Sequence, residues 1–389
     1  MLAIVYNNPA PYFSARLVAA GRTGALCAAP LFGQGSREDG RALFEEKEPA
    51  PSPAEIVARV EAFLDGLCPD VVALHGWSRR SSLAALRWAA TRRTPTVMLG
   101  DFQAYGRRHG IAENHVKRRL LRFCGAFLVG GSPHAEFLSG LGLPRDRIFT
   151  GYDVVDNAHF SQGAQLARSH EPEARARLEL PPKYFLAVGR LAPEKNPLFV
   201  MDAYARYLAD TRPSGVWPLV IVGDGPLREV VVAHRNRLGL ERHVRLVGLK
   251  SYDELPAYYG LASVFVHAST RDSWGLVVNE ALAAGLPALV SKQSSCMPDL
   301  VRDGVNGYAF DPRDAGALAR HFNAASTGQY DLNVLGRCGR ELISGWSPDT
   351  FAERLWHCAA LAGSAIVPQV GIADNLFFKA LIFRPGAPD

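Results

Sequence analysis

Two cations follow an apolar run in the second half of the chain. The run Tyr184–Val188 leads into Gly189 and Arg190, and Lys195 follows shortly after. A buried parallel strand would deliver Gly189 and Arg190 to its carboxyl end, and Lys195 would then open the next helix. Arginine offers a bidentate fork and lysine a point charge, so together they could grip a diphosphate. A solvated basic loop is the alternative interpretation of the same residues.

A glycine-rich turn comes next. Gly223, Asp224 and Gly225 follow the apolar run Leu219–Val222, and Pro226 suits the first position of a helix. A dinucleotide-binding fingerprint would need one more glycine, but residue 228 is arginine. We therefore interpret Gly223 as part of a tight strand-to-helix turn beside a ligand, and such turns alone are weak indicators.

The most specific segment starts at Asp272 and reads DSWGLVVNEALAAGLP. A helix that begins near Gly275 would leave its first N–H groups free to bind an anion. Glu280, one turn inside, could accept hydrogen bonds from ribose hydroxyls. Helix capping by Asp272 and dipole compensation by an exposed Glu280 are the structural alternatives. The donors expected at this helix start are the backbone groups of Gly275, Leu276 and Val277.

The first half of the chain offers fewer candidates. Asp101 follows the apolar run Thr96–Leu99, where it could orient an acceptor hydroxyl or accept its proton. An ordinary turn aspartate is an equal alternative. His75 follows Val71–Leu74, and for it we prefer a hydrogen-bonded histidine at a strand end.

A basic helix is expected over Glu113–Phe127, with cations among apolar residues. Such a helix can lie on anionic lipid, and an ordinary solvated face over a core is the alternative. Nucleic acid is not an expected partner, because the basic residues are not interleaved with exposed aromatics. The cations expected on one exposed face are Lys117, Arg118, Arg119 and Arg122.

The elements that must position these residues alternate along the chain. Short apolar runs alternate with segments of helical periodicity, such as Ile56–Leu67. This alternation predicts an α/β protein with parallel sheets covered on both faces, in two Rossmann-like doubly wound domains. The expected strands are Ala3–Tyr6, Val71–Leu74, Thr96–Leu99, Ala126–Val129, Tyr184–Val188, Leu219–Val222, Ser263–Val266 and Ala288–Val290.

Length and composition agree with two domains. The 389 residues exceed one ordinary core. We expect an N-terminal domain over 1–165, a C-terminal domain over 166–345, and a segment 346–389 that returns to the first domain. The stretch Gln162–Leu180 is expected to connect the domains. Scattered cysteines and an N-terminus that reads as a strand predict a cytoplasmic protein. The mild net charge of +5 is compatible with anionic substrates or a membrane surface and indicates neither.

The second half resembles the nucleotide-sugar glycosyltransferases of family 4, which have the GT-B architecture. The resemblance runs from Tyr184 to about Asp314. It rests on four ordered motifs: Gly-Arg…Lys-Asn, Gly-Asp-Gly-Pro-Leu, a carboxylate and a glutamate separated by seven residues, and Asp-Gly-Val-Asn-Gly at 303–307. The segment that begins at Gly130 and the one that begins at Asp153 also resemble members of this family.

The resemblance implies roles for these residues. Arg190 and Lys195 would hold the donor diphosphate, Asp272 would contact the transferred sugar and Glu280 the ribose. It also implies transfer with retention of configuration, from a donor such as a UDP- or GDP-sugar to a glycan or lipid-linked acceptor hydroxyl. No cofactor or metal is expected, and the sequence contains no Asp-x-Asp pair.

Two departures from the family pattern bear on substrates. The family usually has glutamate where this chain has Asp272, so sugar contacts would differ. The first loop, Asn7–Phe13, is rich in proline instead of containing two adjacent glycines. A nucleotide-sugar epimerase or phosphorylase of the same architecture, or a nucleotide-sugar-binding protein without turnover, stays open as an alternative.

Overall fold

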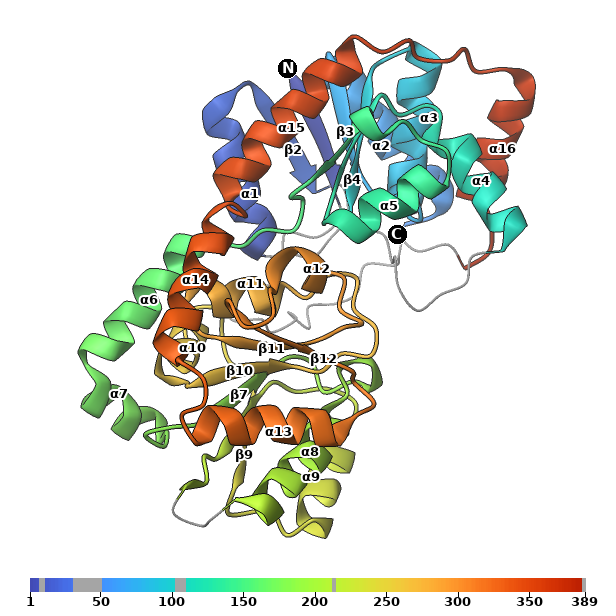
Figure 1. Ribbon diagram of the computed structural model, residues 1–389. Helices are drawn as coiled ribbons and strands as arrows, with labels where there is room; N and C mark the ends of the chain where they lie inside the picture. Colours follow the sequence, from blue (N-terminus) through green and yellow to red (C-terminus); the bar gives the residue numbers. More distant parts are fainter. Residues whose placement is uncertain (7–10, 31–50, 102–109, 212–214, 387–389) are drawn as a thin grey trace. The chain divides into compact units, whose positions relative to one another are not determined.

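A computed structural model describes residues 1–6, 11–30, 51–101, 110–211 and 215–386. The chain forms two compact units (Figure 1). Unit 1 comprises the described residues of 1–102, 107–154 and 348–389, and unit 2 comprises those of 155–347. Most of the first loop, Asn7–Phe13, lies outside the described ranges.

Unit 1 contains a six-stranded parallel sheet in the order β2-β1-β3-β4-β5-β6. Its strands are β1 (Leu2–Tyr6), β2 (Leu26–Pro30), β3 (Val71–His75), β4 (Thr96–Gly100), β5 (Ala126–Val129) and β6 (Ile148–Thr150). Its helices are α1 (Pro11–Thr23), α2 (Pro53–Leu67), α3 (Arg80–Arg92), α4 (Ile111–Leu121), α5 (Ser132–Gly140), the 3₁₀ turn η1 (Arg145–Arg147), α15 (Pro348–Gly363) and α16 (Ile372–Ile382).

Unit 2 contains a second six-stranded parallel sheet, in the order β12-β11-β10-β7-β8-β9. Its strands are β7 (Phe185–Val188), β8 (Leu219–Val222), β9 (Val244–Gly248), β10 (Val264–His267), β11 (Ala288–Ser291) and β12 (Gly307–Phe310). Its helices are α6 (Asn157–Ser169), α7 (Glu171–Leu178), the 3₁₀ turn η2 (Pro193–Lys195), α8 (Pro197–Asp210), α9 (Arg228–Arg237), α10 (Leu255–Leu261), α11 (Leu276–Ala283), α12 (Met297–Leu300), α13 (Ala315–Ser326) and α14 (Leu332–Ser344).

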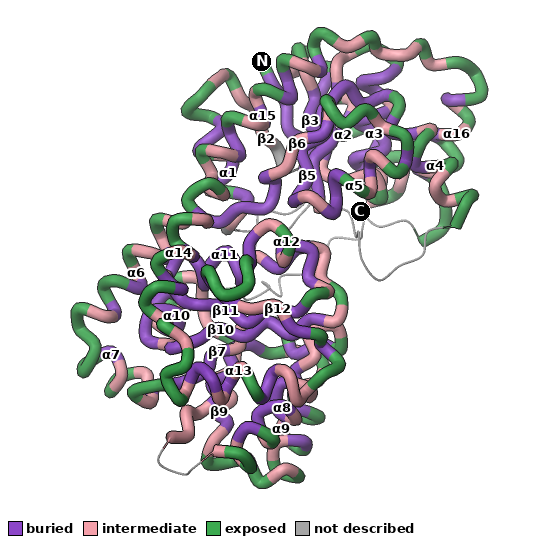
Figure 2. The backbone as a smooth tube through the Cα atoms, in the orientation of Figure 1, coloured by how far each residue is buried: buried purple, intermediate pink, exposed green. Residues whose placement is uncertain are grey.

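The predicted fold class, two doubly wound α/β domains, is confirmed. Central strands are buried on both faces because helices cover them; β1 and β4, for example, are buried throughout (Figure 2). The strand order reverses between β1 and β3 in unit 1 and between β7 and β10 in unit 2. Ligands of such sheets bind beyond the carboxyl ends of the strands at this reversal. The topology therefore directs attention to the loops after β7 and β10.

The boundary between the two units falls at a different position in the sequence from the one expected. The chain passes from unit 1 to unit 2 after Val154, and the expected boundary at residue 165 lies inside α6. The stretch Gln162–Leu180 is helical, in α6 and α7, because Asp156 caps α6 and a buried face of Phe160, Ala164 and Ala167 packs it against α10. It therefore belongs to the body of unit 2.

Helix α15 belongs to unit 1, although it follows unit 2 in the chain. It packs along α1 and against β3–β6, and Phe351 and Leu355 are fully buried. Trp356 Nε1 donates to the carbonyl oxygen of Ala20 at 2.9 Å, and Arg354 Nη1 donates to that of Thr150 at 2.7 Å. These contacts join the end of the chain to its beginning.

The expected exposed basic face of α4 is wrong. Lys117 is 6% exposed, pairs with Glu113 at 2.9 Å and lies near the rings of Trp77 and Phe137. Arg119 and Arg122 both pair with Asp374 of α16, at 3.1 and 2.6 Å. Ion pairing with a distant helix, which helical periodicity cannot reveal, therefore occupies two of the four cations, and a third, Lys117, is buried and paired within α4. No described helix is long and apolar enough to cross a bilayer.

Candidate functional site

The first predicted cation follows β7, as expected. Gly189 and Arg190 come directly after the strand, and Arg190 is exposed without an ion pair to any described residue. Gly223, at the end of β8, approaches this loop so closely that an added Cβ would lie 2.0 Å from the carbonyl oxygen of Gly189. Gly223 therefore has a packing reason of its own, because it lets the two loops touch.

Lys195 ends the 3₁₀ turn η2 instead of opening α8. Its ammonium lies 2.5 Å from Asp272 Oδ2, and the same carboxylate oxygen lies 3.0 Å from His267 Nε2 and 3.3 Å from Ser269 Oγ. Backbone contacts hold the loop: Thr270 N donates to the Glu194 carbonyl at 2.9 Å. The structure thus brings Lys195 and Asp272 together, and it adds His267.

The carboxylate of Asp272 is held in its charged form. Its side chain is 10% exposed, and burial alone raises its pKa. The hydrogen bond and charge of His267, together with the charge of Lys195, outweigh burial, so the pKa of Asp272 lies well below its usual range. In this structure Asp272 therefore pairs with Lys195 and His267 and does not cap α11; the N-cap residue is Gly275, which has no side chain to provide a cap.

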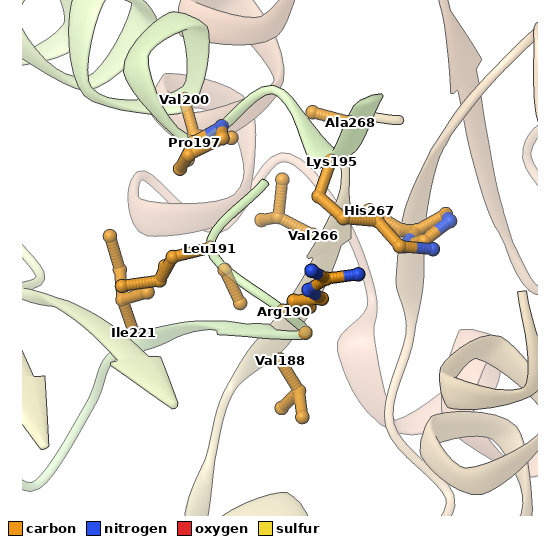
Figure 3. Close-up of a pocket in the computed structure, with 12 residues that line it drawn as sticks. Val188, Arg190, Leu191, Lys195, Pro197, Val200, Ile221, Val266, His267 and Ala268 are labelled. Carbon is orange, nitrogen blue, oxygen red and sulfur yellow. The ribbon is translucent and has the colours of Figure 1, made fainter. Parts of the chain in front are cut away.

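A small cavity lies at the reversal of strand order in unit 2. Figure 3 shows the nitrogen-bearing side chains of Arg190, Lys195 and His267 on one side of it. Its volume is about 30 Å³, which is room for a single water molecule. A larger anion would have to lie across its mouth. Apolar residues line the other side: Val188, Leu191, Pro197, Val200, Ile221, Val266 and Ala268.

The helix start beyond β10 has the expected position. Helix α11 begins at Leu276, and Gly275 precedes it with φ of 111°, a left-handed conformation that favours glycine. A Cβ on Gly275 would lie 3.1 Å from His267 Nε2, so the glycine also lets the backbone approach this imidazole. Trp274 Nε1 donates to Asn279 Oδ1 at 2.9 Å, which ties the loop to the helix. Leu276 and Val277, half-buried, form the first turn.

Glu280 is not the exposed acid that the dipole interpretation required. It is fully buried, and Tyr259 Oη donates to Glu280 Oε2 at 2.6 Å. Tyr259 lies on α10 and is itself buried. The structure therefore gives Glu280 a partner inside unit 2 and does not place it on the wall of the cavity beside Arg190.

Asp101 lies in unit 1, directly after β4 and half-buried. Burial lowers the pKa of nearby His75. The charges of Arg16 and Arg79 lower this pKa further, whereas the Asp101 carboxylate raises it. The rings of His75 and Tyr152 stack with their centroids 5.7 Å apart. The Arg16 guanidinium carbon lies 4.6 Å from the centroid of the Tyr152 ring. These side chains gather where the strand order reverses between β1 and β3.

Sequence reasoning missed His267, Tyr259 and Arg16. His267 interrupts the apolar strand β10, and Arg16 is a charged residue, 3% exposed, on the otherwise apolar side of α1. Arg16 donates to the carbonyl oxygen of Val154 at 3.1 Å and lies 3.4 Å from Asp153 Oδ1. A polar residue at an apolar position was the available signal for both. Tyr259 gave none, because tyrosine is common in helices that pack on a core.

Comparison with known proteins supports the predicted architecture. Residues 170–341 match the model of the family described as glycosyl transferases group 1. The chain is 30% identical over 283 residues to the D-inositol 3-phosphate glycosyltransferase of Mycobacterium sp. (strain JLS), covering 68% of this chain and 60% of that protein. It is 31% identical over 199 residues to the GDP-mannose-dependent alpha-(1-6)-phosphatidylinositol monomannoside mannosyltransferase of Mycobacterium tuberculosis (strain CDC 1551 / Oshkosh), covering 47% and 51%. The chain therefore spans between half and two thirds of the length of these curated relatives.

Among solved structures, Anabaena Alr3699/HepE in complex with UDP superimposes with a TM-score of 0.72 at 18% identity. The superposition covers 92% of this chain and 99% of that one. At this identity the likeness shows the fold alone. Together, these matches support group 1 of the glycosyltransferases and the GT-B architecture, and the finer assignment to family 4 stays a prediction.

Proposed function

We propose that this protein transfers a sugar from a nucleotide diphosphate sugar, a UDP- or GDP-sugar, to an acceptor hydroxyl with retention of configuration. The observation that carries the proposal is the convergence of Arg190, Lys195, His267 and Asp272 where the strand order reverses. Two of these groups are permanent cations, and a diphosphate is the ligand class that such a pair recognises. The matched segment, residues 170–341, contains all four.

In the proposed mechanism the protein supplies electrostatic stabilisation and no nucleophile. Arg190, Lys195 and the backbone N–H groups at the start of α11 would stabilise charge on the departing diphosphate. Asp272 would hold Lys195 in place before the donor arrives and contact the transferred sugar afterwards. Gly189 and Gly223 would let the backbone approach the ligand. Glu280, whose carboxylate accepts a hydrogen bond from Tyr259 inside unit 2, would bind the ribose.

The acceptor side of the proposal rests on unit 1. Asp101, beside a His75 that burial holds in its neutral form, would orient the acceptor hydroxyl or accept its proton. The mycobacterial relatives are named for inositol phosphate and phosphatidylinositol mannoside substrates, which supports a glycan or lipid-linked acceptor. We place the reaction in the cytoplasm, with the protein at the membrane surface in synthesis of a surface glycan or glycolipid.

A thermal-shift screen against UDP-, GDP- and ADP-sugars tests the donor. A ligand at 100 times its Kd adds about 2.7 kcal/mol of stability, so one nucleotide should raise the Tm clearly above the others. The same shift should be lost in Lys195→Ala and kept in Lys183→Ala, because Lys183 is exposed and precedes the amino end of β7, whereas the site lies beyond its carboxyl end. Turnover is then measured as nucleotide diphosphate release.

Acceptor dependence separates the possible activities. Release of UDP or GDP that requires an acceptor, and that a chelator does not slow, supports the transferase. Conversion of the nucleotide sugar without an acceptor would instead indicate an epimerase, and phosphate-dependent release a phosphorylase. Binding without any turnover, across a panel of lipid and glycan acceptors, would reject the proposed reaction.

A further inference from the structure

The last described helix presents apolar side chains to solvent. In α16, Ile372 is 83% exposed and Leu376 is 62% exposed, and Phe383, directly after the helix, is 49% exposed. At about 100° per residue these three positions fall within an arc of roughly 40°. They therefore form one exposed stripe along α16.

The opposite face of α16 is also apolar. Phe378 and Ile382 are fully buried in the core of unit 1, and Phe378 packs on Phe123 with ring centroids 5.4 Å apart. A helix on the surface of a soluble protein normally pairs one apolar face with a polar one. Because α16 has apolar residues on both faces, its outer stripe calls for a partner.

The charges around the stripe select the kind of partner. Asp374 is the only acidic residue of α16; it points inward and pairs with Arg119 and Arg122. The outer face therefore carries no acid within the helix. Lys379 is exposed and lies about 20° outside that arc, on the same side of the helix. Arg384, also exposed, follows Phe383. The stripe combines apolar side chains with positive charge.

We propose that the outer face of α16, defined by Ile372, Leu376, Lys379 and Phe383, docks onto an anionic membrane. The apolar side chains would enter the boundary between headgroups and acyl chains. Lys379 would extend its ammonium to lipid phosphates, and Arg384, whose Nη2 donates to the carbonyl oxygen of Ser78 at 3.1 Å, would add positive charge nearby. A second copy of the chain fits less well, because a symmetric contact would cover Lys379 with the same apolar stripe and offer it no acid.

This inference rests on the proposed function only in that a lipid-linked acceptor gives membrane contact a purpose. The test measures binding without turnover, so the two proposals can fail separately. A wild type that binds nucleotide but no anionic vesicles would reject the docking face alone. Vesicle binding without acceptor-dependent release of nucleotide diphosphate would reject the transferase alone.

Sedimentation with phosphatidylcholine vesicles, with and without phosphatidylglycerol, tests the docking face. The wild type should bind the anionic vesicles, and added NaCl should weaken binding. Leu376→Glu should weaken binding by about tenfold or more, because the substitution removes apolar burial and adds a negative charge that the anionic lipid repels. The matched control is Leu166→Glu on α6, where the leucine is 63% exposed, and it should bind as the wild type does.

Several results would overturn the proposal. These are a wild type that stays in the supernatant, a Leu376→Glu variant that binds normally, and a Leu166→Glu variant that loses binding equally. Analytical ultracentrifugation adds another: a dimer that Leu376→Glu dissociates would assign the stripe to a second copy. Retained UDP- or GDP-induced thermal shift confirms that a variant is folded; if Leu376→Glu fails it, Ile372→Ser, at a more exposed position, takes its place.

Discussion

The contact between Lys195 and Asp272 makes a prediction in which two substitutions have opposite signs. In the structure the ammonium pairs with the carboxylate at 2.5 Å. A diphosphate that binds Lys195 must compete with that carboxylate. Lys195→Ala should therefore weaken binding of UDP or GDP, whereas Asp272→Asn should strengthen it, because it frees the lysine and removes a negative charge beside the phosphates.

The magnitudes follow from burial and charge. Two unit charges about 4 Å apart interact by about 4 kcal/mol at the effective dielectric constant of a protein surface. Solvent and the remaining partners of each group reduce this, since Lys195 is 27% exposed. We expect about tenfold tighter binding for Asp272→Asn, which is about 1.4 kcal/mol. For Lys195→Ala, loss of a donor to the leaving group should lower kcat by about 100- to 1000-fold.

The assays are titration calorimetry with UDP and GDP, and acceptor-dependent nucleotide release at saturating donor. A double-mutant cycle in thermal unfolding isolates the pair: we expect a coupling energy of about 1–2 kcal/mol, beyond the about 0.5 kcal/mol scatter of independent sites. Lys183→Ala is the control, because it removes an exposed lysine before the amino end of β7, away from the site. Near-normal turnover by Lys195→Ala, or weaker nucleotide binding by Asp272→Asn, would mean that the diphosphate lies elsewhere.

Three further predictions concern the same unit. Arg190→Ala should lower kcat by about 100- to 1000-fold without lowering the Tm, and Arg190→Lys should recover only part of the activity, because an ammonium cannot reproduce the fork; full recovery would argue against bidentate binding. The pKa of Asp272 is lowered in the folded state, so its stabilisation is present above about pH 4 and lost as pH falls further. The difference in unfolding free energy between wild type and Asp272→Asn should therefore shrink as the pH falls below about 4 in urea titrations; a difference that stays unchanged down to about pH 2 would contradict this assignment. Tyr259→Phe leaves the buried Glu280 without its 2.6 Å hydrogen bond and should cost about 1–3 kcal/mol in urea unfolding, whereas Glu280→Gln should raise the Kd for UDP or GDP more than it lowers kcat; an unchanged urea midpoint for Tyr259→Phe would show that Glu280 has another sufficient partner.

Central strands were predictable from sequence and edge strands were not. Every predicted strand is found, and each is an interior strand of its sheet. The strands missed are β2, β6, β9 and β12, which are the edges of the two sheets. An interior strand is covered on both faces and becomes continuously apolar, whereas an edge strand has a neighbour on one side only and tolerates residues such as Arg245 in β9.

The site divides in a similar way. The loops that carry Arg190 and Gly275 could be placed, because a strand followed by a helix start fixes where the intervening residues emerge. The partners of these residues could not be placed, since Lys195–Asp272, Glu280–Tyr259 and the pairing of Arg119 with Asp374 join elements far apart in the chain. Periodicity describes one helix at a time and contains no information about its neighbour.

The origin of α15 has a consequence for synthesis on the ribosome. Unit 2 is one continuous stretch of chain, whereas unit 1 needs residues from both sides of it. Strands β3–β6 emerge early, yet the helix that buries Phe351 and Leu355 against unit 1 is translated after all of unit 2. Domains generally fold as units while the chain elongates. Unit 2 should therefore complete its fold first. The sheet of unit 1, although translated earlier, keeps the apolar surface under α15 uncovered until residues 348–363 have been synthesised.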